Sequence, residues 1–136
     1  MRIKWVGRDV SALAKLDAEC FPADTPLDPN EGRWFILWDG EKPAAFGGLV
    51  TDPKTHLAYF VRGGVAYGYR GQGLYKRVLT YAAKVAAREG CKAIWTYCLT
   101  HNAASANGLY GAGYRVFDPG LLTSSMADAI YFTRKL

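Results

Sequence analysis

The stretch Val65-Ala-Tyr-Gly-Tyr-Arg-Gly-Gln-Gly-Leu74 is the most informative segment of the sequence. Residues 56–66 read as a strand, whereas residues 73–88 repeat apolar side chains at helical spacing. The first N–H groups of a helix have no partner inside it, and the helix dipole is positive there. Glycines leave room for such groups to converge on an anion. The stretch therefore predicts a phosphate-binding loop between a strand and a helix.

Two common phosphate loops do not match this segment. It is not a Walker A loop, because no Gly-Lys-Ser/Thr follows. It is not the dinucleotide motif GxGxxG either, because the third glycine is absent and no early βαβ unit precedes it. A glycine-rich turn by itself is commonly only a turn. The basic residues Arg70, Lys76 and Arg77 favour a binding role, because they suit a pyrophosphate flanked by a further phosphate.

Over the rest of the chain, the periodicity of the apolar residues predicts one α+β domain, residues 1–136, with a mixed sheet flanked by helices. Asp9 is expected to cap the first helix, Asp39-Gly40 to form a hairpin turn, and Gly90 to end the second helix. The expected order is β-α-β-β-β-α-β-α-β-β. The expected strands are 2–6, 33–38, 44–50, 56–66, 93–99, 114–117 and 130–134, and the expected helices are 9–20, 73–88 and 102–111.

Length and composition limit the class of protein. The 136 residues are 50% hydrophobic and 21% charged, a balance typical of a globular domain. The sequence lacks both an apolar run of ~20 residues and a signal-like start, so we expect a cytoplasmic protein without a membrane partner. Cys20, Cys91 and Cys98 are odd in number and match no zinc spacing. They are expected to be reduced thiols, and we expect no metal.

The positive charge is concentrated in one part of the chain. Residues 60–110 contain seven Lys or Arg and one Glu, a net charge of +6, whereas the whole chain carries +5. Such a block attracts polyanions, for which nucleic acid and a polyphosphorylated cofactor are both candidates. A solvated basic helix face would look the same, and charge alone does not separate these three readings.

The loop resembles the acetyl-CoA signature of the GNAT superfamily of N-acetyltransferases, Arg/Gln-x-x-Gly-x-Gly/Ala. Arg70, Gly73 and the strand ending at Val65-Ala66 match it, and Tyr75 stands where the family has Gly or Ala. Asn102-Ala-Ala-Ser105, Gly113-Tyr114, the first helix ending in Cys-Phe-Pro and the last strand also resemble the family. The resemblance implies a GNAT-like sheet that is splayed between the fourth and fifth strands.

The resemblance also implies how acetyl-CoA is held. The pantetheine arm should lie in the splay, with Gly63-Gly64 forming a bulge there and N–H groups near residues 64–66 facing the thioester oxygen. Asn102 is expected to contact the arm, to cap a helix, or both. The expected cofactor-binding residues are Val65, Ala66, Arg70, Gly71, Gln72, Gly73, Leu74, Tyr75 and Asn102.

The catalytic residues are less evident from the sequence. The tyrosine that the family places near the CoA sulfur falls on Leu109 in register, and Tyr110 follows it as the candidate acid. The family's base position falls on Tyr59, so His56 is the candidate base. Water relayed to Asp28 or Glu31 is the alternative. The base matters more for the rate than the acid does, because an alkyl amine with a pKa near 10.4 is only ~0.1% neutral around pH 7.4 and must lose a proton before it attacks.

The resemblance implies an acetyl-CoA-dependent N-acetyltransferase in which the primary amine of an acceptor attacks the thioester directly. The acceptor is either a small molecule or a protein amine, and a homodimer is possible. Two alternatives stay open: a CoA-binding protein that has lost turnover, and a small basic nucleic-acid-binding module. The strand–loop–helix placement of residues 70–74 makes nucleic acid the less favoured partner.

Overall fold

The structure is a computed structural model that describes residues 1–120, 122–123 and 126–136. The order β-α-β-β-β-α-β-α-β-β is confirmed, with two short 3₁₀-helices added, η1 (Pro29–Glu31) and η2 (Tyr67–Tyr69). The helices are α1 (Ser11–Cys20), α2 (Leu74–Arg88) and α3 (Ala103–Gly111). The strands are β1 (Arg2–Trp5), β2 (Arg33–Asp39), β3 (Lys42–Asp52), β4 (Leu57–Val65), β5 (Ala93–Leu99), β6 (Arg115–Val116) and β7 (Ala129–Lys135).

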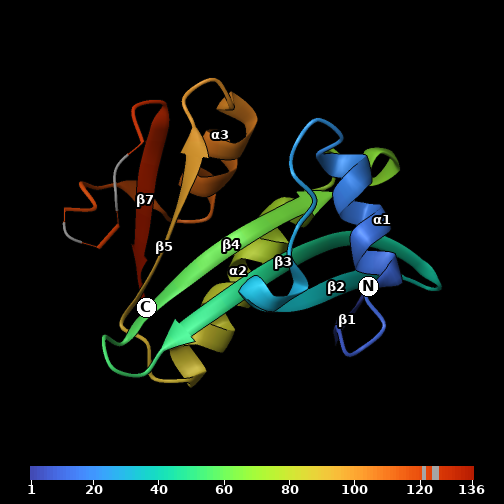
Figure 1. Cartoon of the computed structure of the whole chain (residues 1–136), viewed down its shortest axis with the longest axis horizontal. Helices are drawn as coiled ribbons and strands as arrows, with labels where there is room; N and C mark the ends of the chain where they lie inside the picture. The colour runs from blue at the N-terminus through green and yellow to red at the C-terminus, as the bar shows by residue number, and fades with distance from the viewer. Residues whose placement is uncertain (121, 124–125) are drawn as a thin grey trace.

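The described strands form one mixed sheet in the order β1-β2-β3-β4-β5-β7-β6. Among these described strands only β4 and β5 run parallel, and they pair over just three residues, Leu57–Tyr59 with Ala93–Trp95. Beyond these pairs the two strands diverge, which Figure 1 shows as an opening between β4 and β5. The predicted splay between the fourth and fifth strands is therefore confirmed.

Helices cover the two faces of the sheet unequally. The apolar side of α2 packs behind the central strands (Figure 1), and Val78 and Leu79 are fully buried in the same core cluster as Phe35. On the front face α1 covers only the half that contains β2 to β4, through Leu13 and Leu16 (Figure 1). The front of β5 and β7 has no helix over it among the described elements. No helix in the described ranges is long and apolar enough to cross a bilayer.

Local details differ from the expectations at a few points. Helix α1 begins at Ser11, so its N-cap is Val10 and not the expected Asp9. The Asp9 carboxylate accepts hydrogen bonds from both the N–H and the hydroxyl of Ser11, at 3.0 and 2.6 Å. The loop 22–32 contains one turn of 3₁₀-helix, for which Asp28 accepts a hydrogen bond from the N–H of Asn30. The loop expected over 118–129 includes residues 121, 124 and 125, which lie outside the described residues.

The β-bulge was predicted at the wrong residues. Gly47 pairs with Gly63 and Leu49 pairs with Phe60, so Val61 and Arg62 together oppose the single residue between Gly47 and Leu49. The bulge therefore lies one step before the Gly63-Gly64 pair. It brings Arg62 to the point where β4 leaves β5.

One buried hydroxyl gives a test of the core. Tyr114 is completely buried, and its hydroxyl has no hydrogen-bond partner among the described residues. Because an unsatisfied buried polar group costs about 1–3 kcal/mol, we expect Tyr114→Phe to raise the free energy of unfolding by about 1 kcal/mol. Urea denaturation measures this change. Tyr131→Phe is the matched control, since the Tyr131 hydroxyl accepts a hydrogen bond from Met126 N–H and its loss should destabilise. A less stable Tyr114→Phe protein would contradict this account.

Candidate active site

A cavity of about 550 Å³ lies at the N-terminus of α2 and extends into the splay. Its walls come from the end of α1, the end of β4, the loop 69–75 and the start of α3. Segments far apart in sequence are thus brought to one place, because β4 leads directly into the loop and α3 follows β5. Cys20 and Phe21 close it from the α1 side.

The loop before α2 presents unpaired donors to this cavity. Gly71 and Gly73 have φ values of +79° and +76°, a left-handed conformation that favours glycine. The N–H groups of residues 71–75 have no acceptor among the described residues. Gly73 is the N-cap of α2 and supplies no side-chain cap. Together with the helix dipole, this geometry suits a phosphate group.

Arg70 is fixed at the mouth of the loop. Its Nε donates to the carbonyl of Val65 at 3.1 Å, and its guanidinium lies 4.4 Å from the centroid of the Tyr67 ring. The Val65 carbonyl also accepts a hydrogen bond from Cys20 Sγ at 3.3 Å. These contacts tie the loop to the end of β4.

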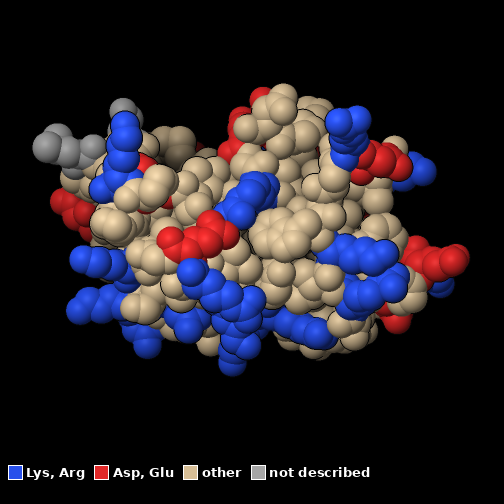
Figure 2. All heavy atoms as spheres, turned by 90° about the horizontal axis from the view of Figure 1, so that it is seen from below, with Lys and Arg blue, Asp and Glu red and all other residues tan. Residues whose placement is uncertain are grey.

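Positive charge continues from the loop along α2. The exposed side of the helix carries four basic side chains, and a shallow cavity of about 410 Å³ runs beside it from Gly73 to Lys84. Figure 2, seen from below, shows Lys and Arg gathered along the lower edge of the molecule. Much of the positive block in the sequence thus flanks the loop 69–75. The four residues are Lys76, Arg77, Lys84 and Arg88.

A second cavity, of about 380 Å³, lies on the other side of the splay. It is bordered by the bulge of β4, the second half of β5 and residues 21–25. It carries two charged side chains among the described residues, Asp24 and Arg62. The two cavities meet, because five residues line both of them: Phe21, Gly63, Tyr75, Asn102 and Ser105.

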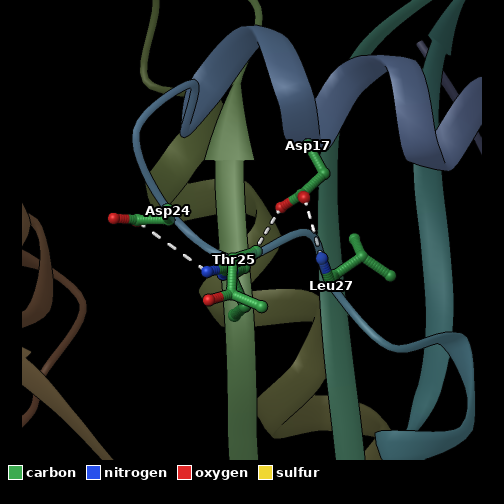
Figure 3. A network of polar contacts seen from close by, with 5 residues as sticks. Asp17, Asp24, Thr25 and Leu27 are labelled. Atoms are coloured by element: carbon green, nitrogen blue, oxygen red, sulfur yellow. Dashed lines mark hydrogen bonds and ion pairs between the residues drawn. The ribbon is translucent and has the colours of Figure 1, made fainter.

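A polar network holds the rim of the second cavity (Figure 3). Asp17, which is 2% exposed, accepts hydrogen bonds from Arg62 Nη1 at 2.8 Å and from the N–H of Leu27 at 3.0 Å. Arg62 also donates to the carbonyl of Thr25, and its Nη2 lies 3.8 Å from the Asp24 carboxylate. The network therefore joins α1, the bulge and the loop that follows α1.

Most of the expected cofactor-binding residues lie together. Of the nine, all but Ala66 and Gln72 are among the described lining of the first cavity. Gln72 is exposed, and the N–H of Ala66 donates to the carbonyl of Ala44 at 2.8 Å. Ala66 therefore does not direct its N–H into the splay, in contrast to the expected arrangement around residues 64–66. Because the two sides of a strand alternate, the N–H of Val65 faces the splay instead.

Asn102 sits at the junction of the two cavities. Its side-chain oxygen accepts a hydrogen bond from the N–H of Ser105 at 3.1 Å, so it caps α3. Its side-chain NH₂ group has no partner among the described residues. The cap role predicted from the sequence is therefore present.

The two candidate catalytic residues are not brought into either cavity. Tyr110 is 47% exposed and packs edge-on against Phe132, while Leu109 is fully buried in the core. His56 is exposed in the turn before β4, at the end of the strand far from the bulge. The geometry therefore gives no support to a catalytic role for Tyr110 or His56.

The other candidates for the base also lie outside the second cavity. Burial raises the pKa of Tyr59 to about 12, and its ring stacks on Trp95 with 4.4 Å between centroids. Glu31 and Asp28 belong to the 3₁₀ turn η1 and its cap. Among the described acids, Asp24 is the one that lines this cavity.

Sequence reasoning missed two residues at the junction and rim, Arg62 and Ser105. Arg62 carried no local signal, because its place depends on the position of the bulge. Ser105 was noted only as part of the Asn-x-x-Ser resemblance. Tyr75 was expected among the cofactor-binding residues, and its side chain lines the second cavity as well as the first.

Comparisons with known proteins agree with this fold. An acetyltransferase from Bacillus subtilis in complex with CoA has a TM-score of 0.81 and 15% identity, over 99% of this chain and 98% of that one. The ribosomal-protein-S18-alanine N-acetyltransferase of Escherichia coli has a TM-score of 0.79 and 18% identity, over 98% and 92% of the two chains. A search of curated proteins found no match. These likenesses establish a shared fold.

The family itself is established by a sequence model. The model of the acetyltransferase (GNAT) family matches residues 8–114, which include the loop, α2, β5 and most of the residues that line both cavities. The expected resemblance is thereby confirmed over most of the sequence. The chain belongs to the acetyltransferase (GNAT) family.

Proposed function

We propose that this protein transfers the acetyl group of acetyl-CoA to a primary amine by direct attack on the thioester. The observation that carries the proposal is the meeting of two cavities along a shared wall. One cavity ends on a loop suited to phosphate, and the other opens to solvent on the opposite side of the splay. A donor and an acceptor bound in them would meet at the shared residues.

The first cavity would hold the donor. The unpaired N–H groups of residues 71–75 would bind the pyrophosphate, with Arg70 and the basic residues of α2 adding positive charge. The N–H of Val65 and the NH₂ group of Asn102 would hydrogen-bond to the amides of the pantetheine arm. Bound there, acetyl-CoA supplies an activated acetyl group as a thioester.

The second cavity would hold the amine. Asp24 attracts its ammonium form and, through water, accepts the proton that the amine must lose before attack. The Asp24 side chain is 56% exposed, so water reaches it freely. Arg62 Nη1 already pairs with Asp17 Oδ1 at 2.8 Å, whereas its Nη2 lies 3.8 Å from Asp24. Much of the negative charge of Asp24 therefore remains available to attract the amine.

The test is release of CoA thiol from acetyl-CoA in the presence of spermidine, tryptamine or a peptide with a free N-terminus, with the product identified by mass spectrometry. We expect turnover with at least one of these amines. Stabilisation by CoA without acetylation of any of them would instead support a CoA-binding protein without turnover. Salt-sensitive nucleic-acid binding that CoA does not displace would support the basic binding module.

Substitution of Asp24 tests the proposed role of the carboxylate. We expect Asp24→Asn to lower kcat/KM for the amine at least ~10-fold, because a positioned base is typically worth ~10²–10⁴-fold, and to leave the affinity for acetyl-CoA unchanged. Asp28→Asn is the matched control, since Asp28 lies in the same loop and outside the described cavity walls. Equal loss in both variants would argue against a specific role for Asp24.

A further inference from the structure

Tyr75 departs from the family signature and occupies an unusual position. It lies in the first turn of α2, next to the phosphate loop, and its side chain reaches across to α3. There its hydroxyl lies 3.3 Å from Ser105 Oγ. The ring rests on Gly108, where a built Cβ would come within 2.6 Å of Tyr75 Cδ2. The side chain thus contacts α3 at two points, through its hydroxyl and through its ring.

This position is the junction of the two cavities. Under the proposed function, on which this inference rests, the thioester has to be reached from both cavities, so it lies where their walls are shared. Five described residues form that shared wall, and two of them carry a hydroxyl, Tyr75 and Ser105. A phenol ionises near pH 10, much more readily than an aliphatic alcohol, and is therefore the better proton donor.

We propose that the Tyr75 hydroxyl is the proton donor to the leaving sulfur of CoA. The amine nitrogen forms a C–N bond to the acetyl carbon, and the C–S bond breaks with its electron pair going to sulfur. Tyr75 Oη passes its proton to that sulfur. The phenolate then recovers a proton from the acetylated ammonium through water or the Ser105 hydroxyl. In sum the amine loses one proton and the sulfur gains one.

The surroundings of Tyr75 favour a donor over a base. Burial raises the pKa of its hydroxyl, so the group stays protonated at neutral pH. Tyr110, at 47% exposure and outside both cavities, is not placed to compete for the role. Cys98 also faces the junction, and burial raises its pKa as well, so it stays a neutral thiol.

Tyr75→Phe tests the proposal while keeping the ring that packs on Gly108. We expect kcat to fall roughly 10-fold to 100-fold with little change in the KM for acetyl-CoA, because the hydroxyl acts only as the C–S bond breaks. In the wild-type enzyme kcat should fall as alkaline pH approaches the raised pKa of Tyr75, and this fall should be absent in Tyr75→Phe. Tyr110→Phe is the matched control and should match the wild type.

A second measurement does not depend on turnover. CoA bound with a free thiol is titrated by following the ultraviolet absorbance of its thiolate. A hydrogen bond from Tyr75 stabilises the thiolate, so the pKa of the bound thiol should rise in Tyr75→Phe and stay unchanged in Tyr110→Phe. Identical thiol titrations, or full kcat in Tyr75→Phe, would overturn the role of Tyr75. A wild-type protein that binds CoA and acetylates no amine would overturn the proposed function, and the titration would still decide whether Tyr75 contacts the sulfur.

Discussion

Gly73→Glu is expected to abolish measurable binding of CoA. The substitution places a carboxylate at the N-cap of α2, beside the N–H groups that would bind the pyrophosphate. It also forces a side chain into a left-handed conformation, with φ of +76°, which costs about 1–2 kcal/mol. Repulsion between like charges at the anion site adds to this cost. We expect the Kd measured by calorimetry to rise more than ~100-fold, a loss of about 2.7 kcal/mol.

Two control variants separate charge from strain and from misfolding. A Cβ at Gly73 meets no atom within 4 Å, so the variant should fold. Gly73→Asn keeps the same position without negative charge, and Asn tolerates the left-handed region, so most of the affinity should remain. Gly68→Glu adds the same charge five residues earlier, outside the described cavity lining, also with open space around the Cβ. Unchanged affinity in a folded Gly73→Glu protein would refute the phosphate loop.

Asp17→Asn is expected to destabilise the protein and to weaken binding of the amine. The substitution removes the charge that pairs with Arg62, whose side chain is only 24% exposed. Removing one partner of a fully buried pair typically costs 3–5 kcal/mol, and the partial exposure of Arg62 reduces this to about 2–3 kcal/mol. Thermal unfolding should show Tm lower by roughly 10 °C.

The same substitution should affect the two substrates differently. Asp17 accepts hydrogen bonds from Leu27 and Arg62 (Figure 3) and thereby fixes the loop 21–27, part of which lines the second cavity. We expect the KM for the amine to rise more than the KM for acetyl-CoA. Asp24→Asn serves as the control for stability, because Asp24 is exposed and lies 3.8 Å from Arg62, a pair worth about 0–1 kcal/mol. Equal Tm values for the two variants would contradict the importance of the buried pair.

The parts of the molecule that were predictable are those encoded locally. The 15 residues of α2 repeat their apolar positions at helical spacing, and the glycines before it mark a loop, so both were found from the sequence alone. Strand β5 was predicted with its observed bounds, Ala93–Leu99, since its run of apolar residues is bounded by polar ones. These local patterns can be recognised without knowing which distant residues the segment will contact.

The rest of the site depends on contacts between distant segments. Arg62 and Asp17 are 45 residues apart, and Tyr75 and Ser105 are 30 apart. No local pattern encodes such pairs. The helical phase of α3 is also set by packing: Leu109 turns into the core, and Tyr110, about 100° further round the helix, turns outward. Counting residues along the sequence could not decide which of the two faces the core and which faces solvent.

The close fit of Tyr75 on Gly108 limits how this protein can be engineered for heat resistance. Exchanging a helical glycine for alanine usually gains about 1 kcal/mol through better helix propensity. At Gly108 the added methyl would lie 2.6 Å from the Tyr75 ring and would have to displace it from Ser105. Gly108 is therefore required by the packing of the Tyr75 ring, and Gly108→Ala is a poor choice for stabilising α3.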